Sequence, residues 1–129
     1  MPLVRIEMYK GKEKAYKQAI FEGVHKALVS AFRIPDNDRN QLIYELDEEN
    51  FERNTNKSGQ FTIIEITAFK GRSLEAKRNL YREIFNNLKL DAGISESDIL
   101  VYINEPQLEN WGIKGLPASE TDIGFEIKV

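Results

Sequence analysis

The residue best suited to chemistry is Pro2, which directly follows the initiator methionine. Because methionine aminopeptidases accept small second residues, removal of Met1 would leave Pro2 with a free secondary amine. Free α-amino groups titrate near pH ~8, and an apolar pocket with nearby cations would bring the pKa of the amine toward neutrality, where a general base works best. A plainer interpretation also exists, because proline is tolerated as the first residue of an edge strand. Pro2 alone therefore permits a catalytic base without requiring one.

The segments that must position Pro2 occur twice in the chain. Residues 9–12, Tyr-Lys-Gly-Lys, recur as Phe-Lys-Gly-Arg at residues 69–72, so residue 10 falls on residue 70. The same displacement carries Ile34 onto Ile94 and Asp38 onto Asp98. Such self-similarity indicates an internal duplication. The repeat breaks at its first position, where Thr62 stands in place of Pro2, so only the first half carries the candidate base.

Each repeat predicts a strand, a helix and a second strand. The hydrophobic periods place the first strands at residues 3–8 and 61–69, the helices at residues 16–32 and 74–88, and the second strands at residues 41–46 and 99–103. Two right-handed β-α-β units, about residues 2–46 and 61–104, predict an α+β fold with one four-stranded main sheet and both helices on one face. We expect a single domain over residues 1–129. In the tail, residues 105–129, the alternation at 123–127 predicts a short C-terminal strand.

The sheet face away from the helices has no predicted cover. Strands such as Ile63-Ile64 and Leu100-Val101 are apolar on both sides. The same face of other subunits is the economical cover, so we expect an oligomer.

Composition restricts the function classes. The 129 residues are 41% hydrophobic and 30% charged, with a net charge of -3, which argues against nucleic-acid or anionic-membrane binding. The absence of cysteine removes disulfides and thiolate chemistry, and the sequence has neither a signal-peptide pattern nor a membrane-spanning run, so we expect a cytoplasmic protein. The single histidine, His25, makes no metal cluster, and we expect it to be solvated or capping, with no role. We expect no metal and no cofactor.

The chain resembles the tautomerase superfamily along essentially its whole length. The residues that carry the resemblance are the opening Met1-Pro2-Leu3-Val4, the runs 34–39 and 69–73, and Asn104-Glu105-Pro106 with Asn110-Trp111-Gly112. The chain is most similar to the fused, two-unit branch that includes malonate semialdehyde decarboxylase. This resemblance implies a homotrimer in which the processed Pro2 acts as base or acid.

The resemblance also implies roles for three charged residues. Arg72 would be the cation for a substrate carboxylate, since guanidinium binds carboxylates bidentately and favours negative charge on an enol. Its plainer interpretation is an exposed turn cation. Asp38 would activate water or polarise the substrate, although Asp98 in the corresponding turn equally supports a turn role. Lys70 stands where a second arginine is expected and would help to bind substrate as a point charge.

The same resemblance implies an aromatic pocket wall. Trp111 would be part of that wall and therefore a substrate-binding residue, whereas a lone tryptophan is otherwise more often core or interface. Ile113 stands where another bulky aromatic wall residue is expected, and we include it among the substrate-binding residues.

The leading hypothesis is keto–enol proton transfer on a small 2-keto or enol carboxylic acid, with Pro2 as the general base. One alternative is a hydratase or decarboxylase acting on a β-keto or unsaturated acid, with Asp38 positioning water. Another is a non-catalytic trimeric binding protein of the same fold. All catalytic versions require that Met1 be removed, because the Pro2 nitrogen is otherwise an amide.

Overall fold

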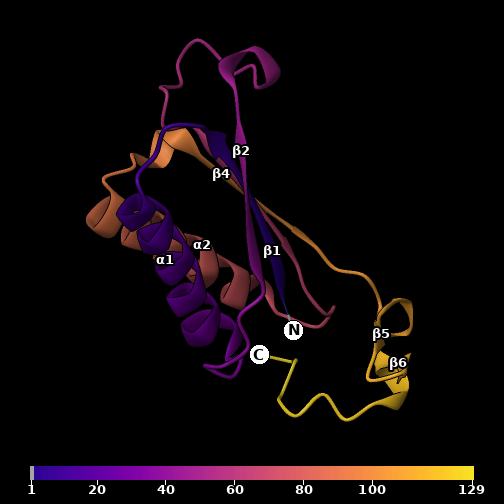
Figure 1. Ribbon diagram of the computed structural model, residues 1–129. Helices are drawn as coiled ribbons and strands as arrows, with labels where there is room; N and C mark the ends of the chain where they lie inside the picture. Colours follow the sequence, from indigo (N-terminus) through magenta and orange to yellow (C-terminus); the bar gives the residue numbers. More distant parts are fainter. Residues whose placement is uncertain (1) are drawn as a thin grey trace.

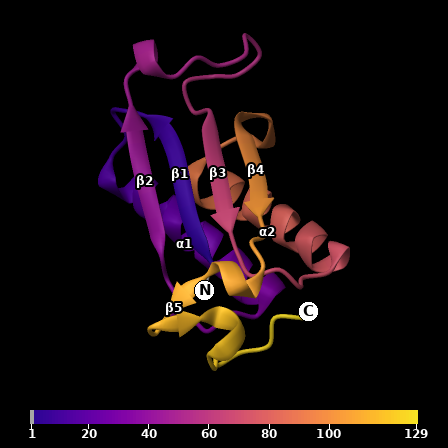
Figure 2. The ribbon, with the colours of Figure 1, turned by 90° about the vertical axis from the view of Figure 1, so that its right-hand side faces the viewer.

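The computed structural model describes residues 2–129, so Met1 and the prediction of its removal lie outside the described residues. Figure 1 shows one main sheet with both helices on the same face and the C-terminal tail beyond one end of the sheet. The strands are β1 (Leu3–Tyr9), β2 (Gln41–Leu46), β3 (Thr62–Thr67) and β4 (Ile99–Asn104). They lie in the order β2-β1-β3-β4, as Figure 2 shows. The predicted four-stranded α+β fold is confirmed.

Strand directions follow from the duplication. Each β-α-β unit pairs its two strands in parallel, β1 with β2 and β3 with β4. The two units meet through the antiparallel pairing of β1 with β3, in which Leu3 lies opposite Thr67 and Ile6 opposite Ile64. This pairing brings the start of β1 beside the end of β3. Pro2, just before β1, and Phe69, shortly after β3, are therefore brought close together.

The two helices, α1 (Lys14–Phe32) and α2 (Leu74–Ala92), pack against each other and the sheet. Gly23 of α1 permits close approach, because a Cβ there would lie 3.0 Å from a methyl of Leu88. Asn87 donates a hydrogen bond of 2.9 Å to the Gly23 carbonyl across the same contact. The Ser73 hydroxyl caps α2 by accepting from the Ala76 amide at 3.1 Å, as its position before the helix predicts.

Alternation along the strands separates the core from the open face. Val4, Ile6 and Met8 of β1, with Ile64 and Ile66 of β3, are buried against the helices. Burying such side chains stabilises the fold by about 1.5–3 kcal/mol each. Their neighbours in sequence point to the opposite face of the sheet.

That opposite face is apolar along its two edge strands and charged in the middle. In β2, Leu42 is 43% exposed and Tyr44 is 44% exposed. In β4, Leu100 is 50% exposed. In the central strands, Arg5 lies directly opposite Glu65. The apolar edges fit the expected cover by other subunits, whereas the charged centre is a feature that the hydrophobic pattern did not predict.

The tail does not contain the predicted strand at residues 123–127. Gly124 has φ +88°, which breaks an extended run, and Phe125 and Val129 pack on the core through side chains rather than on a sheet edge. A small hairpin of β5 (Gly112–Ile113) and β6 (Leu116–Pro117) forms earlier in the tail. Within residues 2–129, single-turn 3-10 helices also lie at residues 48–50, 96–98, 108–110 and 118–120.

His25 is not solvated, and the prediction for it is wrong. The side chain is 2% exposed, and its Nε2 lies 3.3 Å from an Asp36 carboxylate oxygen. The chain after α1 brings Asp36 to His25, a contact between separate elements that helical periodicity alone does not predict. Among residues 2–129, neither helix has an apolar stretch long enough to cross a lipid bilayer.

Candidate active site

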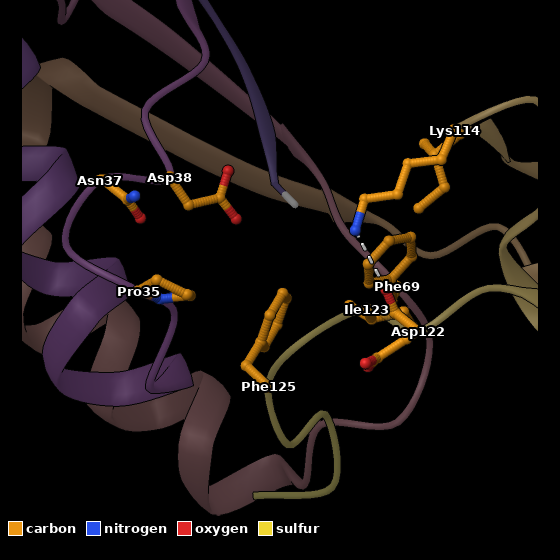
Figure 3. Close-up of a pocket in the computed structure, with 9 residues that line it drawn as sticks. Pro35, Asn37, Asp38, Phe69, Lys114, Asp122, Ile123 and Phe125 are labelled. Atoms are coloured by element: carbon orange, nitrogen blue, oxygen red, sulfur yellow. Dashed lines mark hydrogen bonds between the residues drawn. The ribbon is translucent and has the colours of Figure 1, made fainter.

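A cavity of about 430 Å³ lies between the helix–sheet body and the tail (Figure 3). Three parts of the chain build it: the turn after α1, the end of β3, and the tail with its hairpin. The lining residues are Pro35, Asn37 and Asp38 from the turn, Phe69 after β3, and Ile113, Lys114, Asp122, Ile123 and Phe125 from the tail. Most of the lining is apolar, with a few charged groups, as in small-molecule sites.

Pro2 lies next to this cavity by strand register. Val4 pairs with Gln41 in the parallel ladder, and its amide donates to the Asn40 carbonyl at 2.9 Å. Two residues earlier, Pro2 therefore falls beside the end of the turn that carries Asp38. In the antiparallel ladder Leu3 lies opposite Thr67, which leads Pro2 toward Phe69. Pro2 is buried. The turn that carries Asp38 and the segment that carries Phe69, which lie on its two sides in the sheet, both line the cavity.

Arg72 lies behind the aromatic wall and is not the exposed turn cation of the plainer interpretation. It is 6% exposed, and its guanidinium carbon lies 4.8 Å from the Phe32 ring centre and 6.0 Å from that of Phe125. One guanidinium nitrogen donates to the Phe69 carbonyl at 2.9 Å. The other two, Nε and Nη2, are buried without a partner within residues 2–129. Buried donors are rarely left unpaired, so this guanidinium has capacity for an anion.

The charge of Arg72 interacts with the cavity. Burial lowers the pKa of its guanidinium, while the nearby carboxylates of Glu105 and Asp38 act in the opposite direction. Arginine remains protonated despite such a shift, since its ordinary pKa is so high. The result is a permanent positive charge behind Phe125, with two carboxylates nearby.

Asp38 is half-buried in the cavity wall, where the sequence pattern allowed either a functional or a turn role. Its amide donates to the Pro35 carbonyl at 3.0 Å, and its carboxylate accepts from the Asn40 side chain at 3.0 Å. In Figure 3 the carboxylate points from the turn into the cavity. The residue thus belongs to a turn and also lines the cavity.

Of the two expected wall residues, Ile113 lines the cavity and Trp111 lies behind the lining. Ile113 lines the cavity, as does Phe69, which the sequence pattern indicated only as part of a repeated run. Trp111 stands behind Phe69 in an edge-to-face contact, with ring centres 4.9 Å apart, and its indole nitrogen donates to the Pro106 carbonyl. Trp111 therefore supports the wall from outside and is not among the described residues that line the cavity.

Lys70 does not line this cavity, although it directly follows Phe69. It is exposed and lines a separate surface depression with Gln107 and Glu109. The lysine that lines the cavity is Lys114, which the sequence pattern did not indicate. Lys114 and Phe125 lie in the tail and have no repeat partner, so neither the duplication nor the hydrophobic period pointed to them.

The duplication also creates a counterpart of this site, where the end of β1 meets the start of β3, but the connection between the halves fills it. Tyr9 corresponds to Phe69, and the ring of Phe51 stacks on it with centres 4.5 Å apart. The Tyr9 hydroxyl also donates to the Phe51 carbonyl at 2.5 Å. Lys12, the counterpart of Arg72, donates to the Gly59 carbonyl at 3.1 Å.

The carboxylate in this second half is also occupied. Asp98, the counterpart of Asp38, accepts from the Ser58 amide at 2.8 Å and from its hydroxyl at 2.6 Å. Thr62 takes the place of Pro2 and is fully buried. One open site per chain is therefore the arrangement that the geometry supports.

Replacing Ser58 by Ala is expected to destabilise the protein by about 1–2 kcal/mol at pH 7, because one hydrogen bond to a carboxylate is lost. Burial tends to raise the pKa of Asp98, but the hydrogen bonds from Ser58 with the nearby Lys57 and Arg53 outweigh it, so the pKa is lowered. A lowered pKa stabilises the fold above the unfolded value of about 3.9, and this stability is lost as pH falls through the folded pKa. The difference between the variant and the native chain should thus shrink as the pH falls below the unfolded value of about 3.9.

Urea unfolding at pH 7 and at a pH below the unfolded value of about 3.9 measures this effect. Ser30→Ala, at an exposed position of α1, is the control and should show no such pH dependence. A Ser58→Ala effect of equal size at both pH values would contradict the assigned role of the Asp98 carboxylate.

Comparisons with known proteins agree with this geometry. The sequence profile of a family described as "Tautomerase enzyme" matches residues 38–114, and a second profile of the same description matches residues 2–56. The "Probable tautomerase YrdN" of Bacillus subtilis (strain 168) is 28% identical over 116 residues, which cover 86% of this chain and 89% of that protein.

Solved structures share the fold. A malonate semialdehyde decarboxylase, described with decarboxylase and hydratase activities, has a TM-score of 0.78 at 25% identity, covering 84% of this chain and 88% of its own. A fused 4-OT described as an asymmetric trimer has a TM-score of 0.80 at 19% identity, covering 91% of this chain and 96% of its own. Since the first profile spans more than half of the 129 residues, in the part that holds Asp38, Phe69, Arg72 and Ile113, the chain belongs to the tautomerase enzyme family.

Proposed function

We propose that this protein catalyses keto–enol proton transfer on a small 2-keto or enol carboxylic acid, with the processed Pro2 as general base. The observation that carries the proposal is the Arg72 guanidinium. It keeps two buried, unpartnered donors behind a cavity beside which Pro2 begins β1. A cation with spare donors is suited to stabilise an enolate, and a secondary amine is suited to move the proton.

The proposed steps use Pro2, at the edge of the cavity, and Arg72, behind its aromatic wall. The Pro2 amine removes a proton from one site of the substrate, and the negative charge develops on the enolate oxygen. The positive charge of Arg72, close behind Phe125 and with two donors that have no partner among the described residues, stabilises this oxyanion. The prolinium then returns the same proton to the other site, so the amine is restored and no other reactant is consumed. Phe69, Ile113 and Phe125 exclude water and favour the neutral amine.

A second candidate is hydration or decarboxylation of an unsaturated or β-keto acid. The position of Asp38 in the cavity wall supports it, as does the description of the relative with decarboxylase and hydratase activities. In that reaction Asp38 would orient a water molecule. Lys70, which is not among the described residues that line the cavity, would take no part.

The experiment follows the ketonisation of phenylpyruvate enol by ultraviolet absorbance, using chain whose intact mass shows that Met1 is absent. Turnover above the buffer rate is the expected result. Release of carbon dioxide from a β-keto acid, without ketonisation, would favour the second candidate. Binding of carboxylic acids with neither reaction would favour a non-catalytic binding protein of this fold.

We also propose that the chain assembles as a homotrimer through the open face of the sheet. The exposed apolar side chains along β2 and β4 support this assembly, and the fused 4-OT relative is described as a trimer. Light scattering should give three times the mass of the 14.9 kDa chain. A stable monomer would contradict the proposal.

A further inference from the structure

We propose that Lys114 binds the carboxylate of the substrate at the mouth of the cavity and so determines its specificity for acids. This inference rests on the proposed function, and it assigns a role to a residue that the repeat and the family resemblance do not indicate. Arg72 then stabilises the enolate charge from behind the aromatic wall, while Lys114 binds the carboxylate. The two negative charges of the reacting acid are met by two different cations.

The backbone at Lys114 is the first observation. Ile113 pairs with Leu116, so Lys114 and Gly115 form a two-residue turn between β5 and β6. Both have positive φ, 53° for Lys114 and 82° for Gly115, as in a type I′ turn. The first position of such a turn favours Asn, Asp or Gly, and lysine there bears a conformational cost. Because the turn itself does not favour lysine, we infer that the Lys114 side chain has a function.

The direction of that side chain is the second observation. Lys114 lines the cavity, and in Figure 3 its ammonium points inward above Phe69. It donates to the Asp122 carbonyl at 3.3 Å, a long contact that leaves further donors for a ligand. The Asp122 carboxylate points away from Lys114 in the same view and accepts from the Gly124 amide at 2.9 Å. The ammonium charge therefore remains effective in the cavity.

The distribution of charge orients a bound acid. Asp38 and Lys114 lie on opposite walls of the cavity (Figure 3). A substrate carboxylate is repelled by Asp38 and attracted by Lys114. The Asp122 carboxylate also lines the cavity but is directed away from Lys114, so the substrate carboxylate should lie beside the Lys114 ammonium. Phe125 stands between the cavity and Arg72, whose guanidinium is buried, whereas Lys114 is exposed. The first direct cationic contact for an entering acid is thus Lys114.

Calorimetry with two unreactive probes of equal shape tests the inference, 3-phenylpropionate and its neutral amide, 3-phenylpropionamide. Lys114→Met should weaken binding of the acid about 10-fold, the size of one charge-assisted hydrogen bond, and leave binding of the amide unchanged. Lys114→Arg should retain most of the preference for the acid. Lys70→Met is the matched control, since it removes an exposed lysine outside the cavity, and it should bind both probes as the native chain does.

The outcomes separate this inference from the proposed function. If Lys114→Met binds the acid normally, the inference is wrong, although ketonisation through Pro2 could still hold. If the variant loses acid and amide equally, the cavity has changed shape, and only restored acid binding in Lys114→Arg would uphold the inference. In turnover, Lys114→Met should raise KM about 10-fold with little change in kcat, because its contact is present before reaction.

Discussion

Blocking the nitrogen of Pro2 is expected to slow ketonisation of phenylpyruvate enol by at least about 100-fold, the lower range for loss of a general base. One additional residue before Pro2 converts its amine into an amide, which has no basic lone pair at neutral pH. The start of β1 lies beside the segments that carry Asp38 and Phe69, so an amine there is within the site. The rate loss should be in kcat as well as in kcat/KM.

The matched preparations differ only before Pro2. Each is released by a protease from a precursor with an N-terminal extension. Cleavage directly before Pro2 leaves the free amine, and cleavage one residue earlier leaves a single residue ahead of Pro2, as verified by intact mass. Pro2→Ala, which keeps a less rigid primary amine, should fall between them, with a loss of about 10-fold. Equal turnover by the free and blocked chains would exclude Pro2 as the base, whatever the fate of Lys114.

Replacing Arg72 by Met is the second change with a large expected effect. It should lower kcat/KM by about 100-fold or more, as removal of a group that stabilises an oxyanion does. Its effect on stability should be small, with the free energy of unfolding changed by no more than about 1 kcal/mol. The lost hydrogen bond to Phe69 and the lost contact with the Phe32 ring are offset by removal of two buried donors that have no partner.

This combination distinguishes a functional guanidinium from a structural one. Breaking a well-paired buried charge typically costs about 3–5 kcal/mol. A loss of that size in urea unfolding of Arg72→Met would show that the guanidinium holds the fold together. Arg72→Lys keeps the charge without the fork of donors, and it should recover only part of the activity.

The duplication predicted most of the fold from local features. Apolar residues at strand and helix periods placed β1, α1 and β2, and the repeat supplied β3, α2 and β4. Burial of one face per element then leaves few arrangements. The tail was less predictable, because Gly124 interrupts an alternating pattern and the segment is held by isolated contacts such as Phe125 on the core.

Part of the candidate site was also predictable from the sequence, and part was not. Asp38 and Ile113 were expected at the cavity and line it, and Arg72 lies directly behind its aromatic wall. Lys70 was expected there too, but it immediately precedes Gly71, whose φ of +142° turns the chain. A Cβ on Gly71 would come within 2.9 Å of Ile127, so the tail lies against this loop and Lys70 remains outside.

By itself, the sequence determined that only one half of the duplicated chain can offer a prolyl amine, because covalent order decides which residue comes after Met1. It also determined the strands and helices, since their hydrophobic periods are local. Only the tertiary structure decided which charges meet that amine. Phe51 and Ser58 close the second site, Phe125 covers Arg72, and Lys114 enters the cavity through contacts between distant segments. Those contacts depend on packing in three dimensions, which no local spacing encodes.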